Sequence, residues 1–210
     1  MNKTRTLLVI AFIIFAQAFV TLADKSKRTA DYFPLRVGDS WTYRNGADGS
    51  EYRLKVLREE PQPDGPSRYL VELSAGVKVE TLYSKAGGWV LLHAVRYPEH
   101  EGLEAKYEPP RQYLQNPLVA GTKWEWQGKD QTQTERHEAS RVAGFENITV
   151  AAGKFRAMKV VSLITGAAAP MTKTYWYADG VGMVKTTTEA GEIKYGSELI
   201  DYSFKKKTQK

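Results

Sequence analysis

The chain has 210 residues, with 30 Lys and Arg against 24 Asp and Glu, and it contains no cysteine. All of the net charge of +6 comes from two basic residues at the start of the chain and four at its end. Because the residues between carry no net charge, the chain is not expected to bind nucleic acid, which requires several clustered basic side chains. The absence of cysteine excludes disulfides, thiolate nucleophiles, metal sites with cysteine ligands and a lipid attached to cysteine.

Residues 1–23 have the three parts of a secretory signal peptide. Lys3 and Arg5 form the charged start, Leu7–Phe15 is the apolar segment, and small residues lead to a cleavage site after Ala23. A second small-residue site lies five residues earlier. An uncleaved anchor is the alternative, but the apolar stretch is shorter than the ~20 residues that span a bilayer. We therefore expect an exported protein, either periplasmic or secreted.

Residues 24–204 are predicted to form a single all-β domain. Apolar and polar residues alternate in short runs, as in Val71–Ser74, and clusters rich in Gly, Asp and Asn separate these runs. A period of two with closely spaced turns is typical of an antiparallel meander. The pattern leaves room for short helical turns only near Ser26–Phe33 and Arg111–Gln115.

The sequence contains an internal duplication. The pattern P-L-x-x-G-x-x-W-x-[Y/W] occurs at Pro34–Tyr43 and again, 83 residues later, at Pro117–Trp126. Two further pairs of segments match in the same order, and their changing spacing fits insertions in hairpin loops. These pairs are Tyr83–Val90 with Tyr177–Val184 and Glu104–Tyr107 with Glu192–Tyr195.

Two six-strand meanders are expected from this duplication, one at about 33–108 and one at about 116–204, with Glu108–Arg111 in the connection. Neither copy can bury its apolar face alone. The copies should therefore pack on each other, or continue into one curved sheet, half-barrel or barrel of about 10–12 strands. A curved sheet of that size leaves a concave surface or a cavity.

Three segments resemble a broad group of exported bacterial β-rich proteins of unassigned function. Tyr32–Tyr43 resembles their Y-x-P-L-x-x-G-x-x-W-x-Y start, Thr149–Val160 their V-P-A-G-x-F-x-x-x-K-V segment, and Tyr175–Lys185 their W-Y-A-x-G-V-G-x-V-K hairpin. Ala151 departs from the pattern, since the family usually has Pro there. The resemblance implies a β-rich fold over most of the chain and no catalytic activity. More remotely, the chain is similar to the half-barrels of LolA/LolB-type bacterial lipoprotein carriers, which are closed by helices.

The aromatic residues support two interpretations. Trp41 and Trp124 occupy equivalent positions in the two copies, where burial of a large apolar side chain explains them as structural anchors. Alternatively, aromatic side chains line a cavity for an apolar ligand. The ligand-lining candidates are Trp41, Trp89, Trp124, Trp126, Trp176 and Tyr177. The residues expected to shape turns and strand starts are Pro34, Gly38, Pro117, Gly121, Gly180 and Gly182.

The sequence shows none of the common hydrolase, zinc-protease or phosphate-loop motifs. His93 and His100 are the candidate metal ligands, together with nearby glutamates. A solvated hairpin tip explains them better, because a straight strand would separate the two imidazoles by ~20 Å. Asp39 and Glu125 are the remaining candidate pair of carboxylates, and the repeats place ordinary surface residues at both positions. We therefore predict no cofactor, no metal and no catalytic residue, with a carboxylate-based hydrolase as the alternative.

These observations favour a binding function. We expect a non-catalytic binding or carrier module for an apolar or amphiphilic ligand, such as a lipid or an acyl chain. The alternative is a structural or interaction module of the bacterial envelope, acting on a protein partner through a strand edge or an apolar patch. The basic tail, residues 205–210, is expected to be solvated or else to contact an anionic membrane surface. Its basic residues are Lys205, Lys206, Lys207 and Lys210.

Overall fold

The computed structural model describes residues 28–100, 103–130, 132–166 and 169–204, and these residues form twelve strands and no helix. The predicted signal peptide and basic tail lie outside the described residues. The strands are β1 (Ser40–Asn45), β2 (Glu51–Gln62), β3 (Gly65–Ala75), β4 (Val77–Ala86), β5 (Trp89–Arg96), β6 (Glu104–Gln115), β7 (Lys123–Lys129), β8 (Glu135–Val150), β9 (Gly153–Thr165), β10 (Met171–Ala178), β11 (Gly182–Ala190) and β12 (Ile193–Ser203).

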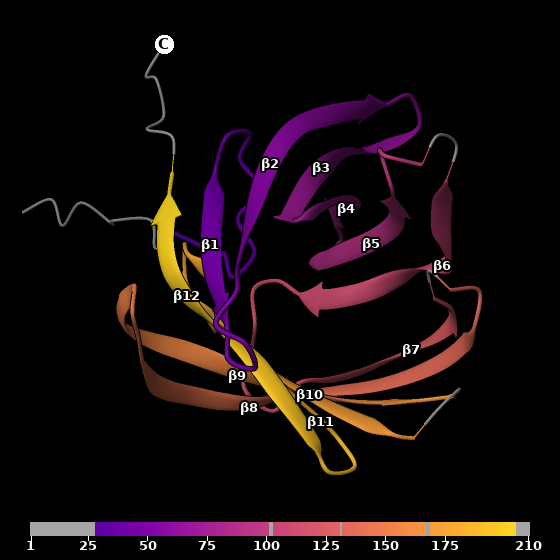
Figure 1. The fold of residues 1–210 in the computed structure, drawn as a ribbon. Coiled ribbons are helices and arrows are strands. Elements are labelled where there is room, and N and C mark those ends of the chain that lie inside the picture. The colour runs from indigo at the N-terminus through magenta and orange to yellow at the C-terminus, as the bar shows by residue number, and fades with distance from the viewer. Residues whose placement is uncertain (1–27, 101–102, 131, 167–168, 205–210) are drawn as a thin grey trace, which may run out of the picture.

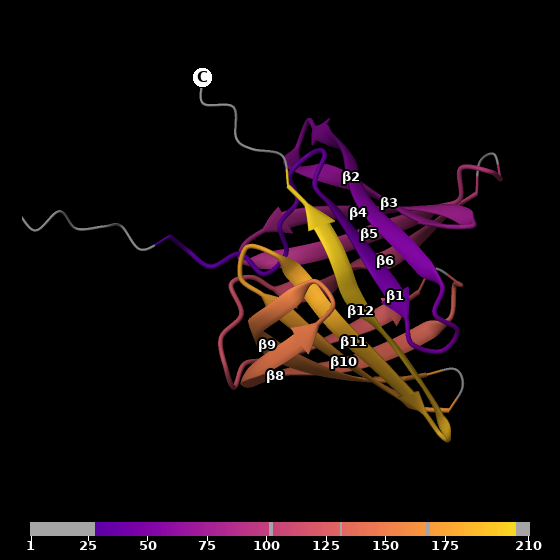
Figure 2. The same cartoon turned by 60° about the vertical axis from the view of Figure 1, so that its left-hand side comes forward.

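The strands close into one antiparallel barrel (Figures 1 and 2). Each strand lies beside the strands that precede and follow it, and β1 pairs with both β2 and β12, which closes the ring. Figure 2 shows β12 between β1 and β11. The all-β prediction is therefore confirmed, and among the three architectures that the sequence leaves open the chain adopts the closed barrel.

The predicted helical turns are wrong. Arg111–Gln115 is the end of strand β6, and the described part of Ser26–Phe33 is irregular. In β6, Arg111 and Tyr113 project to the same side of an extended strand, so the charged and aromatic side chains share a face as period-two residues do. Both segments are too short for their sequence pattern to distinguish a helical turn from an extended strand.

The matched segments of the duplication occupy equivalent places in the barrel, six strands apart. Gly38, before β1, donates its amide hydrogen to the carbonyl of Val56 at 2.8 Å, and Gly121, before β7, donates to Val142 at 2.9 Å. Both glycines have positive φ, 95° and 86°, a region that residues with a Cβ rarely enter. The same strand start is thus built twice with the same hydrogen bonds.

The seam between β6 and β7 is the weakest contact in the ring, because the two strands pair only at Glu108 and Lys129. The expected connection, Glu108–Arg111, lies inside β6 instead, and the chain crosses to β7 through residues 116–122. The prolines in this segment fit a strand because residues 107–110 bulge out of the β5–β6 ladder and do not need amide donors there. Two indoles of β7 bridge the seam: Trp124 donates to the Gln112 carbonyl and Trp126 to the Pro109 carbonyl, each at 3.1 Å.

The chain before β1 covers one end of the barrel. Asp31 binds Lys85 Nζ at 2.8 Å and Asn116 Nδ2 at 2.8 Å, and its carbonyl accepts from Gly180 at 2.7 Å. Lys85 lies near the end of β4, and Asn116 and Gly180 lie in the β6–β7 and β10–β11 connections, so all three partners are at the same end of the antiparallel barrel. The N-terminal segment, residues 30–35, is therefore tied across that end, with Tyr32 and Leu35 buried.

Candidate ligand-binding cavity

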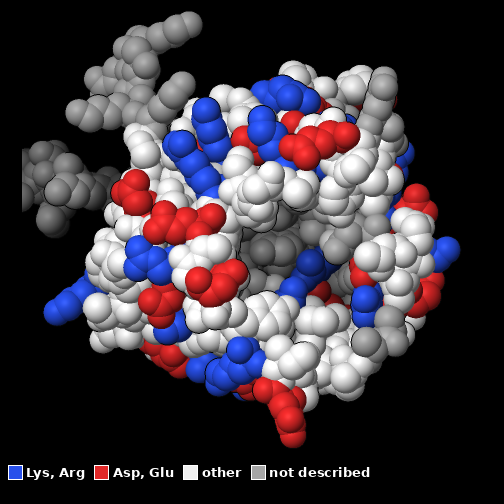
Figure 3. All heavy atoms as spheres, viewed as in Figure 1, with Lys and Arg blue, Asp and Glu red and all other residues white. Residues whose placement is uncertain are grey.

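The barrel encloses a cavity of ≈ 570 Å³. Its wall is made by the N-terminal segment and by β1 to β6 and β10 to β12. Figure 3 shows a hollow in the middle of the face, with basic side chains inside it. The volume lies within the range of about 300–1,000 Å³ in which proteins hold small molecules, so the cavity has room for one such ligand.

Most of the cavity wall is aliphatic or aromatic. Inward-facing residues alternate along the strands, as Leu54 on β2, Val71 and Leu73 on β3 and Val79 on β4 show. Their outward neighbours, such as Lys55 and Glu72, are polar. Since each strand presents every second side chain to the interior, the sequence pattern that closes the barrel also makes its interior apolar.

An aromatic layer forms the covered end of the cavity. Phe33 packs against Tyr83 and Tyr113, with ring centroids 5.1 and 5.5 Å apart. Tyr113 in turn contacts Tyr175 at 6.5 Å and forms a hydrogen bond with Tyr177. Burial raises the pKa of the phenols of Tyr83, Tyr113 and Tyr177, so these side chains stay neutral and act as apolar surfaces with polar tips.

A buried ion pair interrupts the apolar wall. Arg111 on β6 binds Glu138 on β8 at 2.5 Å, and only 13% and 6% of the two side chains are exposed. Arg111 also bonds the hydroxyls of Tyr107 and Tyr175. Burial acts to lower the pKa of Arg111, but the charge of Glu138 outweighs it and the guanidinium stays charged.

Lys173 on β10 is the second cation in the wall. Burial and the nearby charge of Arg111 lower the pKa of its ammonium group. A second, smaller cavity of ≈ 180 Å³ adjoins this region, with Arg111, Lys173 and Tyr107 in the walls of both cavities. The interior therefore consists of a large, mainly apolar cavity and an adjoining smaller pocket with charged side chains in its wall.

The six ligand-lining candidates do not all face the main cavity. Its wall includes Trp41, and Trp126 lines the smaller pocket instead. Trp89 and Trp124 pack edge to face against each other at 5.8 Å. Neither belongs to the main wall among the described residues.

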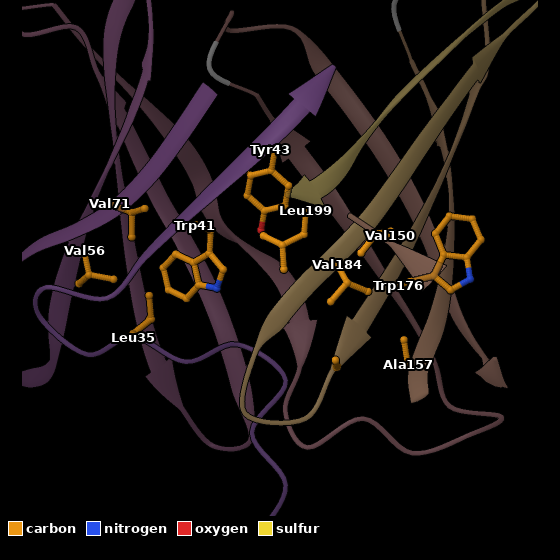
Figure 4. Close-up of a cluster of buried hydrophobic side chains, with 11 residues drawn as sticks. Leu35, Trp41, Tyr43, Val56, Val71, Val150, Ala157, Trp176, Val184 and Leu199 are labelled. Carbon is orange, nitrogen blue, oxygen red and sulfur yellow. The ribbon is translucent and has the colours of Figure 1, made fainter. Parts of the chain in front are cut away.

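Trp176 and Tyr177 are the last two candidates, and neither is in the wall that the described residues form. Tyr175 lines the cavity, so its neighbour Trp176 turns to the opposite face of β10. There its indole donates to Glu146 at 2.7 Å and lies beside Lys159. Figure 4 shows Trp176 on the far side of a buried cluster from Trp41. Tyr177 is buried in the aromatic layer below the cavity.

The turn-shaping candidates gather at the covered end of the barrel. Gly180 and Gly182 have positive φ, 74° and 97°, in the β10–β11 turn. A Cβ on Gly182 would make an ordinary contact with the ring of Pro34 at 3.5 Å, so the positive φ, and not a lack of space, favours glycine at this position. Pro117 begins the equivalent segment of the second copy, before Gly121 and Trp124.

The candidate metal and carboxylate groups are not brought together. His93 bonds Ser84 Oγ at 2.8 Å, and its pKa is lowered by burial and by Arg68. The described residues contain no group of three or more His, Asp or Glu side chains placed to hold a metal ion. Asp39 is buried against Arg36, whereas Glu125 is exposed beside His137 on β7, which lies opposite β1 in the ring.

Three charged residues of the interior, Arg111, Glu138 and Lys173, are absent from the candidates that the sequence provides. Arg111 falls in the expected connection, and the two prolines before it hide the bulged strand β6. Lys173 lies two residues before Tyr175, so the period of two on β10 places both side chains on one face. That spacing is the signal that could have shown a lysine directed into the barrel.

Fold and cavity together define an exclusively antiparallel, internally repeated barrel that encloses a mainly apolar space. The chain belongs to the DUF3108-like family, whose model matches residues 93–197, half of its length. Within the described residues no helix is long and apolar enough to cross a membrane.

Two solved structures share the fold. One is a predicted lipoprotein from Parabacteroides distasonis, with a TM-score of 0.50 and 17% identity over 83% of this chain and 99% of that one. The other is a predicted exported protein with a YmcC-like fold from Bacteroides fragilis, with a TM-score of 0.52 and 15% identity over 83% of this chain and 100% of that one. A search of curated proteins found no match.

Proposed function

We propose that the protein is an exported, non-catalytic binding or carrier protein that holds one lipid or acyl-chain ligand inside its barrel. The observation that carries this proposal is the ≈ 570 Å³ cavity with a mainly aliphatic and aromatic wall. Burying an apolar chain against such a wall releases about 0.8 kcal/mol per CH₂ group, so an acyl chain has a strong driving force to enter.

Two observations support the exported location. Residues 1–23 read as a signal peptide, and the two proteins that share the fold are named as a predicted lipoprotein and a predicted exported protein. The carrier role also agrees with the resemblance to LolA/LolB-type carriers, which stays a prediction. In a helix-closed half-barrel the helices complete the wall, whereas in this barrel the described strands and the N-terminal segment surround the cavity.

The alternative is an interaction module that acts through a strand edge or an apolar patch. The ring gives each described strand a neighbour on both sides, but β6 and β7 pair at one position only, so this seam is where an added strand would find unpaired backbone groups. Val77, Leu103 and Ile193 are 49%, 51% and 65% exposed at the end opposite the N-terminal segment. Val77 begins β4, Ile193 begins β12 and Leu103 directly precedes β6. These residues are the surface through which a protein partner would act.

Native mass spectrometry of the protein purified from its source tests the proposal directly. We expect an added mass that is released by organic solvent and identified as a lipid. Protein that carries no such mass, and that also fails to bind a fluorescent fatty-acid probe after delipidation, would contradict a carrier role.

Filling the cavity gives a sharper test. Thr81 on β4 faces the cavity, and Thr81→Trp should occupy part of its volume and weaken lipid binding at least tenfold, which corresponds to about 1.4 kcal/mol. The matched control is Glu80→Trp, which adds the same ring one residue away, on the opposite face of the strand. Equal binding by both variants, with both folded, would argue against an internal site.

A further inference from the structure

The two internal cavities meet at a pair of cationic side chains. Arg111 and Lys173 belong to the walls of both the ≈ 570 Å³ cavity and the ≈ 180 Å³ pocket. The larger space is apolar, whereas charged side chains make up most of the smaller one. A molecule that extended from one into the other would pass directly between these two groups.

The charges in the smaller pocket do not balance. Its charged residues are the cations Arg111, Arg136 and Lys173 and the carboxylates Asp130 and Glu138. Arg111 pairs with Glu138 at 2.5 Å and Arg136 with Asp130 at 2.7 Å. Lys173 has no ion pair or hydrogen bond among the residues that the structure describes. One positive charge is therefore left over at the junction.

Arg111 has a donor without an acceptor. Its Nε is buried and has no hydrogen-bond partner in the described part of the chain. A buried polar group without a partner destabilises the folded protein, and a buried cation without a counter-ion does so more strongly. Lys173 lies in the walls of both cavities without an ion pair or hydrogen bond among the described residues. Burial and the charges of Arg111 and Arg136 lower the pKa of its ammonium group more than Glu138 raises it. Both deficits would be removed by one anion placed between Lys173 and Arg111.

We propose that the ligand is a single-chain amphiphile with an anionic head, a carboxylate or a phosphate, that binds between Lys173 and the Nε of Arg111. Its apolar chain extends through the aromatic cavity toward Phe33. The inference rests on the proposed function and names the class of ligand for the same cavity. A neutral head would leave the excess charge uncompensated, and a cationic head would meet Lys173 directly.

Three probes with the same chain length and different head groups show how much the head group contributes to binding. The probes are hexadecanoic acid, hexadecyl phosphate and hexadecanol, each titrated into delipidated protein at mildly alkaline pH, where both acids are ionised. We expect one or both anionic probes to bind about 10- to 100-fold more tightly than the alcohol, as charge-assisted hydrogen bonds predict. The anionic probe that binds more tightly, the carboxylate or the phosphate, identifies the head group.

The variant Lys173→Met tests whether Lys173 causes the preference for an anionic head group. It keeps a long apolar side chain in the wall and removes the excess charge, so the preference for the anionic probe over hexadecanol should fall to near unity. Affinity for hexadecanol should be kept, which also shows that the variant is folded. The matched control is Lys123→Met on β7, where the lysine is exposed, and it should retain the full preference.

The outcomes distinguish the two proposals. Wild-type protein that binds all three probes equally, or a Lys173→Met variant that keeps the anion preference, overturns the head-group site and leaves the apolar carrier intact. Protein that binds none of the probes contradicts the carrier itself.

Discussion

At the scale of single residues, Asp31 shows how the N-terminal segment is held. Burial acts to raise the pKa of Asp31, but hydrogen bonds from Lys85 and Asn116 outweigh it and place the pKa below the ordinary value of 3.8. A carboxylate with a lowered pKa in the folded state stabilises that state above the pKa of the unfolded chain. The contribution is therefore present above about pH 4 and disappears as the pH falls through the folded pKa.

Replacing Asp31 by Asn should reveal this dependence. Because the side chain is 37% exposed, solvent screens the interaction, and we expect Asp31→Asn to lower the free energy of unfolding by about 1 kcal/mol at neutral pH. The difference from wild type should shrink as the pH is lowered below 3.8. Urea unfolding at several pH values measures it, with Asp64→Asn in the exposed β2–β3 turn as control. A difference that grows toward acid pH would contradict the assignment.

The sequence alone identifies a residue when its role depends on neighbours in the chain, but not when its role depends on distant strands. Gly38 and Trp41 could be recognised because a turn, a positive φ and a buried aromatic ring repeat at fixed spacing in the second copy. Arg111, Glu138 and Lys173 come from three strands, and only ring closure brings them together. Charged residues inside a barrel look like surface residues in the sequence, since alternation does not say which face is the inner one.

At the scale of strands, the β6–β7 seam depends on close approach rather than on a hydrogen-bond ladder. A Cβ on Gly128 would lie 2.5 Å from the Glu108 carbonyl and 3.0 Å from the Pro109 ring. The seam therefore requires glycine at this position. The number of strands and their order along the chain could be predicted from turns and alternation, but this seam could not, because it joins a bulged strand to its neighbour through side chains.

Gly128→Ala should open the seam. Forcing the backbones apart is expected to lower the free energy of unfolding by about 1–3 kcal/mol, as overpacking does elsewhere. Chemical denaturation measures the change. Gly65→Ala is the matched control, because nothing lies within 4 Å of its added Cβ, and it should change stability by less than about 0.5 kcal/mol. Similar losses in the two variants would show that the seam tolerates a side chain.

At the scale of the whole molecule, the two copies depend on each other. The first copy includes β1 to β6, whose inner face is covered only by the N-terminal segment and the opposite strands, and it would expose unpaired edges at β1 and β6. We expect a fragment of residues 28–115 to show no cooperative urea transition, whereas residues 28–204 show one. Far-UV circular dichroism during denaturation distinguishes them. A cooperative transition in the fragment would mean that one copy is an independent domain.

The pairing of β1 with β12 also determines when the barrel can close during folding. Trp41 lies opposite Tyr202, so the ring joins two strands from the opposite ends of the described chain. Contacts of such long sequence separation form late and slowly during folding. A chain that crosses a membrane from its N-terminus brings β12 out last, and until then the cavity has no complete wall. Under the proposed function, a ligand would therefore enter after export, and a ligand present at that moment would offer a surface on which the last strands assemble.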